Sequence, residues 1–283
     1  MIRSFAIRIK LLAVVLAVLL QPFWLSGQSD TSFRLLRVMQ GDFTAFTTDN
    51  LDNLYVLNSR NQIKKFNSNG DSVAVFNDVK KFGQATLIDV SNPLKILLYY
   101  RDFATVVMLD RFLNVVNSVD LRKQGVLQAR AIGQSYDNKI WVYDELEARL
   151  KKLDEDGSLL QETADFRMLF SDSPVPVKIA DENKYVYVYD PARSVYVFDY
   201  YGALKNAILI RDWENFRVSG KYIFGSKADT LYRYSISSFT YDEWPMPAPV
   251  KGSNSFSFSA TRVYALKPSC DGRNSCLYIY AIQ

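Results

Sequence analysis

A strand pattern that recurs about every 40 residues constrains the fold of this chain more than any other feature. Each recurrence holds two short hydrophobic runs separated by a polar stretch, which is typical of two strands joined by a turn. The first runs are Leu54–Leu57, Ile96–Tyr99, Ile140–Tyr143, Val186–Tyr189, Tyr222–Phe224 and Val263–Leu266. The second runs are Ile63–Phe66, Val106–Leu109, Leu150–Leu153, Val195–Phe198, Leu231–Tyr234 and Leu277–Tyr280. The pattern therefore predicts six similar units.

Further strands flank this pair in each unit. The turns after the second runs contain Gly or Asn, which supply the positive φ of a tight hairpin. These turns are Asn67–Asp71, Asp110–Asn114, Asp154–Ser158 and Asp199–Ala203. A short strand also precedes the first run, as at Phe43–Phe46, Thr86–Asp89, Ala129–Ile132 and Val177–Ala180. Four antiparallel strands per unit and six units predict an all-β, six-bladed β-propeller.

The ends of the pattern predict how the ring closes. The last unit begins near Ser255–Phe258, and the sequence stops at Gln283 after its third strand. A spare strand, Phe33–Met39, precedes the first unit. We predict that this N-terminal strand is the outer strand of the last blade, because the ring then has no exposed sheet edge.

Three of the units carry a resemblance to a known family of folds. Asp52–Asn58 with Gln62–Asp71, and Asp137–Ser158, resemble blades of NHL-repeat and TolB-like six-bladed propellers, and Lys184–Gly202 resembles them more loosely. The last two units depart from the pattern, which leaves five or seven blades open. The resemblance implies one propeller domain over residues 33–283. It does not imply one activity, because such propellers include interaction scaffolds, sugar-binding modules and calcium-dependent hydrolases.

Residues 1–27 have the layout of a cleavable signal peptide. Arg3, Arg8 and Lys10 precede the apolar run Leu11–Leu20, and Gly27 is a small residue suited to cleavage. An uncleaved membrane anchor is the alternative, but this run is half of the roughly 20 residues that span a bilayer. We expect residues 28–32 to be a short tail, and the mature chain to have no transmembrane span. The leader resembles bacterial export signals, which predicts a periplasmic or outer-membrane-associated protein rather than a fully extracellular one.

The two cysteines, Cys270 and Cys276, flank the turn-forming segment 271–275. In an exported chain this arrangement favours a disulfide over a redox pair, which needs a Cys-x-x-Cys spacing. The closed loop would contribute about 2 kcal/mol in the chain-entropy model.

Several chemistries are excluded by residue types that are missing. The chain has no histidine, which removes the Ser-His-Asp triad and every histidine-ligated metal site. It also has no phosphate-binding glycine loop and no nucleophile elbow. The leader holds three of the 34 basic residues and no acid, so the remainder is nearly neutral. We therefore predict no catalytic residue and no nucleic-acid partner.

Carboxylates near strand ends are the candidates for a metal site. We expect no cofactor, because Asp49, Asp89, Asp137 and Asp181 lie in turn sequences whose side chains bond to their own backbone. The alternative is that these four carboxylates hold Ca²⁺ near the axis of the ring. Paired carboxylates could likewise cleave a glycoside, but sequence does not show which acids face each other.

Aromatic residues in polar turns are the candidates for partner binding, since Tyr and Trp are enriched at interface anchors. They are Phe112, Tyr200, Tyr201, Trp213, Tyr241 and Trp244. For each residue alone, core packing or protection of an edge strand is the alternative. The predicted function is a non-enzymatic scaffold that binds envelope proteins, as an accessory subunit of an envelope complex. A carbohydrate-binding or carbohydrate-cleaving propeller and a Ca²⁺-assisted hydrolase are the alternatives.

Overall fold

The computed structural model describes residues 33–259, 261–269 and 274–282, which belong to one compact unit. The predicted signal peptide (1–27), the tail (28–32) and Cys270 lie outside the described residues. The predicted disulfide therefore stays a prediction, although Cys276 is fully buried. Within these ranges, no helix is long and apolar enough to cross a membrane.

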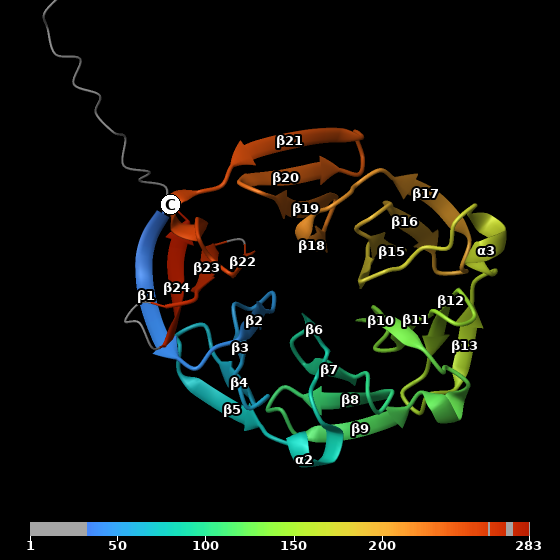
Figure 1. The fold of residues 1–283 in the computed structure, drawn as a ribbon, viewed down its shortest axis with the longest axis horizontal. Helices are drawn as coiled ribbons and strands as arrows, with labels where there is room; N and C mark the ends of the chain where they lie inside the picture. The colour runs from blue at the N-terminus through green and yellow to red at the C-terminus, as the bar shows by residue number, and fades with distance from the viewer. Residues whose placement is uncertain (1–32, 260, 270–273, 283) are drawn as a thin grey trace, which may run out of the picture. The chain divides into compact units, whose positions relative to one another are not determined.

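Six four-stranded antiparallel sheets are arranged as the blades of a ring, which confirms the predicted propeller (Figure 1). Blade 1 runs from β2 (Ala45–Thr48) to β5 (Ser72–Phe76), and blade 2 runs from β6 (Leu87–Asn92) to β9 (Val115–Asp120). Blade 3 runs from β10 (Ala129–Gln134) to β13 (Leu159–Glu162). Their middle strands are β3 (Leu54–Leu57), β4 (Ile63–Phe66), β7 (Lys95–Tyr100), β8 (Thr105–Asp110), β11 (Ile140–Asp144) and β12 (Arg149–Leu153). Blade 4 contains β14 (Lys178–Glu182), β15 (Tyr185–Asp190), β16 (Ser194–Asp199) and β17 (Leu204–Ile208). Blade 5 contains β18 (Glu214–Ser219), β19 (Tyr222–Lys227), β20 (Thr230–Ser235) and β21 (Thr240–Pro245).

The sixth blade joins the two ends of the chain. It contains β22 (Ser255–Phe258), β23 (Arg262–Lys267), β24 (Ser275–Ile282) and, as its outer strand, β1 (Phe33–Gly41). The register of β1 on β24 runs from Phe33 opposite Ile282 to Gly41 opposite Ser275, with an irregularity between Leu35 and Arg37. This pairing confirms the predicted closure of the ring by the N-terminal strand.

The hydrophobic core consists of six clusters, each of which joins two neighbouring blades. Between blades 2 and 3, for example, Leu97 and Met108 pack with Ile132 and Val142. The middle strands are thus covered on both faces, which is why they are continuous apolar runs rather than alternating ones. All five residues of β11 are buried for this reason.

The antiparallel order of the strands gives the ring two distinct faces. The turns between first and second strands and those between third and fourth strands lie on one face, which we name the turn face. The turns between second and third strands and the inter-blade connections lie on the other, which we name the pocket face. Two four-residue helices, α2 (Val79–Phe82) and α3 (Phe166–Leu169), and the 3₁₀ turns η1 (Arg122–Gln124) and η2 (Ala248–Val250) lie in these connections. The sequence pattern did not predict them.

Gly133 allows the first strands of blades 3 and 4 to approach each other closely. A Cβ at this position would lie 2.8 Å from the carbonyl oxygen of Ile179 and 3.1 Å from its Cβ. We expect Gly133→Ala to lower the free energy of unfolding by about 1–3 kcal/mol, because the backbone of β14 must move. Denaturant unfolding measures this change. A variant as stable as the parent would show that the two strands do not pack this closely.

Candidate binding site

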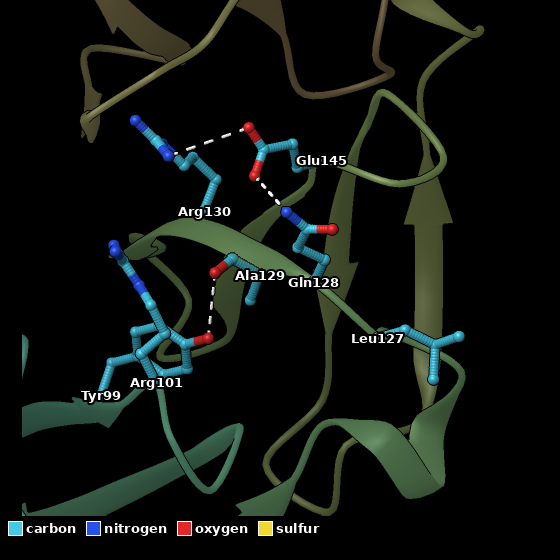
Figure 2. A pocket seen from close by; sticks show the side chains of 7 residues that line it. All are labelled: Tyr99, Arg101, Leu127, Gln128, Ala129, Arg130 and Glu145. Carbon is cyan, nitrogen blue, oxygen red and sulfur yellow. Dashed lines mark hydrogen bonds and ion pairs between the residues drawn. The ribbon is translucent and has the colours of Figure 1, made fainter.

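The pocket face has a pocket of about 220 Å³ between blades 2 and 3 (Figure 2). Its walls come from the end of β7, the connection after β9, the start of β10 and the turn after β11. The lining residues are Tyr99, Arg101, Leu127, Gln128, Ala129, Arg130 and Glu145.

Arg101 begins the turn that joins β7 to β8. Its N–H donates to Thr86 Oγ1 at 3.0 Å, and its carbonyl accepts from the N–H of Ala104 at 3.0 Å. Ala104 closes this turn with a φ of 48°. The backbone is thus held in place while the Arg101 side chain is exposed, and among the described residues that side chain has no hydrogen-bond or ion-pair partner.

Arg130 lies at a bulge in β10. Ala129 pairs with Asp144 and Ala131 with Tyr143, so Arg130 is the extra residue between them. A bulge redirects a side chain out of the regular alternation of a strand. Here it directs the guanidinium toward Glu145, with 3.8 Å between Nη1 and Oε1. This pair is longer than a hydrogen bond.

Glu145 is fixed from its other side by Gln128. Gln128 Nε2 donates to Glu145 Oε2 at 2.7 Å, and the N–H of Glu145 donates to the carbonyl of Gln128 at 2.9 Å. These two contacts tie the turn after β11 to the connection before β10. The carboxylate is therefore held by a neutral amide and paired only loosely with Arg130.

Tyr99 forms a buried wall of the pocket and is only 2% exposed. Its hydroxyl donates to the carbonyl of Ala129 at 2.9 Å, which links blade 2 to blade 3. Burial raises the pKa of Tyr99, while the positive charges of Arg101 and Arg122 oppose that rise. Tyr99 is thus a neutral hydrogen-bond donor at neutral pH, and the arginines supply the charge.

Two guanidinium groups and one carboxylate give the pocket an excess of positive charge. Arginine remains protonated under all ordinary conditions, and its fork of donors fits a carboxylate in a bidentate way. In Figure 2 both guanidinium groups lie toward the left of the view, that of Arg130 above the ribbon of β10 and that of Arg101 below it. The arrangement is suited to binding an anionic group.

Exposed apolar side chains lie in the pocket lining, at Leu127, and in neighbouring segments of the pocket face. Phe103, Leu127, Leu146 and Met168 are 52%, 57%, 54% and 85% exposed, respectively. Their segments are joined to one another by hydrogen bonds. Arg122 Nη2 donates to the carbonyl of Asp102 at 3.1 Å, and Arg167 Nη2 donates to that of Glu147 at 3.2 Å. We name these four residues the apolar border.

Three of the aromatic residues singled out from the sequence lie on the turn face. Phe112 and Tyr201 are 51% and 89% exposed. Tyr200 instead stacks on Tyr136, with 4.5 Å between ring centroids, and donates its hydroxyl to Asp181 Oδ1 at 2.6 Å. Burial and this hydrogen bond raise the pKa of Tyr200.

The Tyr136–Tyr200 stack is part of a cage around Lys152. The ammonium lies 5.1 Å and 5.7 Å from the centroids of these two rings and 5.3 Å from that of Trp141. Its Nζ also donates to Asp137 Oδ2 at 2.8 Å. The cage is therefore filled by a side chain of the protein itself.

The other three aromatic candidates lie in and around blade 5. Trp213 is only 7% exposed and packs against Gly225 and Tyr232, so it is part of the core. Tyr241 and Trp244 are half-exposed on the outer strand β21. The structure does not bring these three residues together with Phe112, Tyr200 and Tyr201.

The four candidate calcium ligands are occupied by protein donors. Asp49 Oδ1 accepts from the N–H groups of Leu51 and Asn53, and Asp89 Oδ1 accepts from that of Ser91. Asp181 Oδ2 accepts from Trp141 Nε1 at 2.9 Å. Within the described ranges, no three His, Cys, Asp or Glu residues are grouped so that they could hold a metal ion.

Comparisons with known proteins show a likeness of fold. No family model and no curated protein matches the chain. Virginiamycin B lyase from Staphylococcus aureus is similar in structure, with a TM-score of 0.59, 8% identity and coverage of 89% of this chain and 100% of that one. The β-propeller domain of Cps50 (Swd1) from Myceliophteria thermophila has a TM-score of 0.55 at 10% identity, covering 89% of this chain and 100% of that one.

A catalytically inactive variant of the same lyase, solved with quinupristin, is also similar. Its TM-score is 0.51 at 11% identity, and the match covers 87% of this chain and 99% of that one. The variant has alanine in place of a histidine. At these identities the comparisons establish the propeller fold and nothing finer.

Proposed function

We propose that this chain is a non-enzymatic, exported propeller that binds a protein partner through the arginine pocket and its apolar border. The observation that carries the proposal is the exposure of Phe103, Leu127, Leu146 and Met168 on the face that holds a pocket with excess positive charge. Exposed apolar side chains gathered on one surface are typical of interaction sites. Aromatic residues, Met and Arg are also the types enriched at such sites.

The scaffold supports this proposal. The residues of the pocket and border lie on turns and connections that a closed ring of sheets holds in place, and loops on rigid scaffolds are where recognition sites are found. The contrast with the similar lyase also supports binding over catalysis. Its inactive variant lacks a histidine, and this chain contains no histidine at all.

The leader supports a location in the bacterial periplasm or at the outer-membrane periphery. A periplasmic partner would be an envelope protein, and the chain would then act as an accessory subunit of an envelope complex. The sequence of the leader is the basis for this part of the proposal.

Site-specific photo-crosslinking in cells that produce the full chain tests the proposal. We expect a crosslinker at Leu127 and another at Met168 to give the same covalent adduct in the periplasmic fraction, because both are exposed apolar residues of the pocket face. The same crosslinker at Leu51, which is 60% exposed on the turn face, is the matched control and should give no such adduct. Adducts of equal yield from all three positions, or none from Leu127 and Met168, would contradict the proposal.

A further inference from the structure

We propose that the arginine pocket binds the carboxylate of an acidic side chain in a peptide segment of the partner. This inference rests on the proposed function and names the chemical group that the site recognises. It follows from the charge, the size and the border of the pocket, taken in turn below.

The net charge of the side chains that line the pocket is suited to one further negative group. Arg101 and Arg130 bring two positive charges, and Glu145 brings one negative charge. The Arg101 side chain has no partner among the described residues, and the Arg130–Glu145 contact spans 3.8 Å. One added carboxylate would neutralise the pocket, whereas a phosphate dianion would leave it negative beside Glu145.

The volume of about 220 Å³ also favours a single side chain. Pockets that enclose whole small-molecule ligands have volumes of roughly 300–1,000 Å³. A Glu or Asp side chain needs less space, and the remainder of its segment would lie over the surface outside the pocket.

The apolar border supplies the surroundings that such an ion pair needs. Phe103 follows Arg101 by two residues, Leu127 precedes Arg130 by three, and Leu146 follows Glu145. Apolar neighbours on the acidic segment would cover these exposed side chains. Residues that exclude water from around a central contact strengthen it. The segment that fits this surface is therefore an acidic residue between apolar residues.

Paired peptides test this inference directly on the full chain. An array would carry short apolar peptides, each in a form with one central glutamate and a form with glutamine at the same position. We expect the glutamate forms to bind at least about tenfold more tightly, since a hydrogen bond to a charged group exceeds one to a neutral group by about that much. The preference should fall as salt is added.

Variants of the two arginines assign the preference to this pocket. Arg101→Ala and Arg130→Ala should each reduce it, and the double variant should abolish it. Arg111, an exposed arginine on the turn face, offers the matched control, and Arg111→Ala should keep the full preference. Thermal unfolding of each variant checks that the ring is intact.

The outcomes separate this inference from the proposed function. Equal signals from glutamate and glutamine forms, including no signal from either, overturn the inference. So does stronger competition by inorganic phosphate than by acetate, because the pocket would then be a phosphate site. If the adducts at Leu127 and Met168 form equally well in the double arginine variant, partner binding at the apolar border holds and the carboxylate inference fails.

Discussion

Removal of β1, residues 33–41, is expected to lower the melting temperature by at least about 10 °C and to make the chain prone to aggregate. The eight residue pairs of β1 with β24 would be lost, and β24 would become an unpaired edge. Phe33 and Met39 would also leave the clusters that join blade 6 to its neighbours. A loss of several kcal/mol corresponds to a shift of this size in a domain of about 250 residues. Scanning calorimetry and light scattering measure both effects.

A permuted chain is the matched control for this deletion. In it, residues 33–41 follow Ile282 through a two-residue turn, so that the same strand pairs with β24 as a hairpin. The register that places Phe33 opposite Ile282 allows this connection. We expect the permuted chain to melt within a few degrees of the parent. If the deletion leaves the melting temperature unchanged, β1 does not close the ring in solution.

Asp144→Ala is expected to lower the free energy of unfolding by about 1.5–3 kcal/mol, because the buried Lys151 ammonium would keep only the more exposed Glu147 carboxylate, 2.8 Å away, as its partner. Lys151 Nζ donates to Asp144 Oδ2 at 2.9 Å, and the side chains are 6% and 1% exposed. Asp144 Oδ1 also accepts the N–H of Leu146, which shapes the turn carrying Glu145. Urea unfolding at neutral pH measures the loss.

Asp144→Asn distinguishes the contribution of the charge from that of the hydrogen bond that shapes the turn. It keeps an acceptor for the N–H of Leu146 and removes the charge that faces Lys151, so we expect a loss between those of the parent and Asp144→Ala. A pair of variants that both match the parent in stability would show that Asp144 and Lys151 do not pair in the folded chain.

The pH dependence gives a second measure of the same pair. Burial lowers the pKa of Lys151, but hydrogen bonds with Glu147 and Asp144 outweigh it and raise that pKa above its usual value. A lysine whose pKa is raised on folding contributes stability below its unfolded pKa of about 10.4 and loses it as the pH rises further. The gap between the parent and Asp144→Ala should therefore be constant from neutral pH to about pH 10 and should shrink above it.

The fold could be predicted from sequence because each blade is encoded locally. The runs Leu54–Leu57 and Ile140–Tyr143 are apolar at every position, since blades cover both faces of their strands, and this signal repeats six times. The closing strand could be predicted by counting, because the last unit was one strand short. The helices α2 and α3 were missed, since four residues are too few to show a helical period.

The candidate site could not be predicted in the same way. Arg101, Arg130 and Glu145 come from two blades, and only the packing of those blades brings them together. Each is an ordinary charged residue near a strand end in its own segment. The bulge at Arg130 has no marker in the sequence, and the apolar border consists of single residues in three separate loops and in α3.

The burial of Trp213 also could not be predicted from the sequence. Its sequence surroundings are polar, with Arg211, Asp212 and Glu214 beside it, and these favoured exposure. The side chain is buried because Gly225, on the neighbouring β19, leaves room for the ring. Tyr200 likewise stacks on Tyr136, which lies 64 positions earlier in the sequence, and no local pattern predicted this contact.

The pairing of the first described strand with the last one also sets the order of events when this protein forms. The strand β1 is synthesised before the five complete blades, and its partner β24 is synthesised after them. The ring can therefore close only when these five blades have been made. The contacts that finish the molecule are those of greatest sequence separation, and such contacts slow folding. Until β24 has formed and paired, β1 is an open edge, and in a chain that has not closed both strands are open to another copy. We therefore expect exchange of β1 between chains to be a misfolding route of this protein.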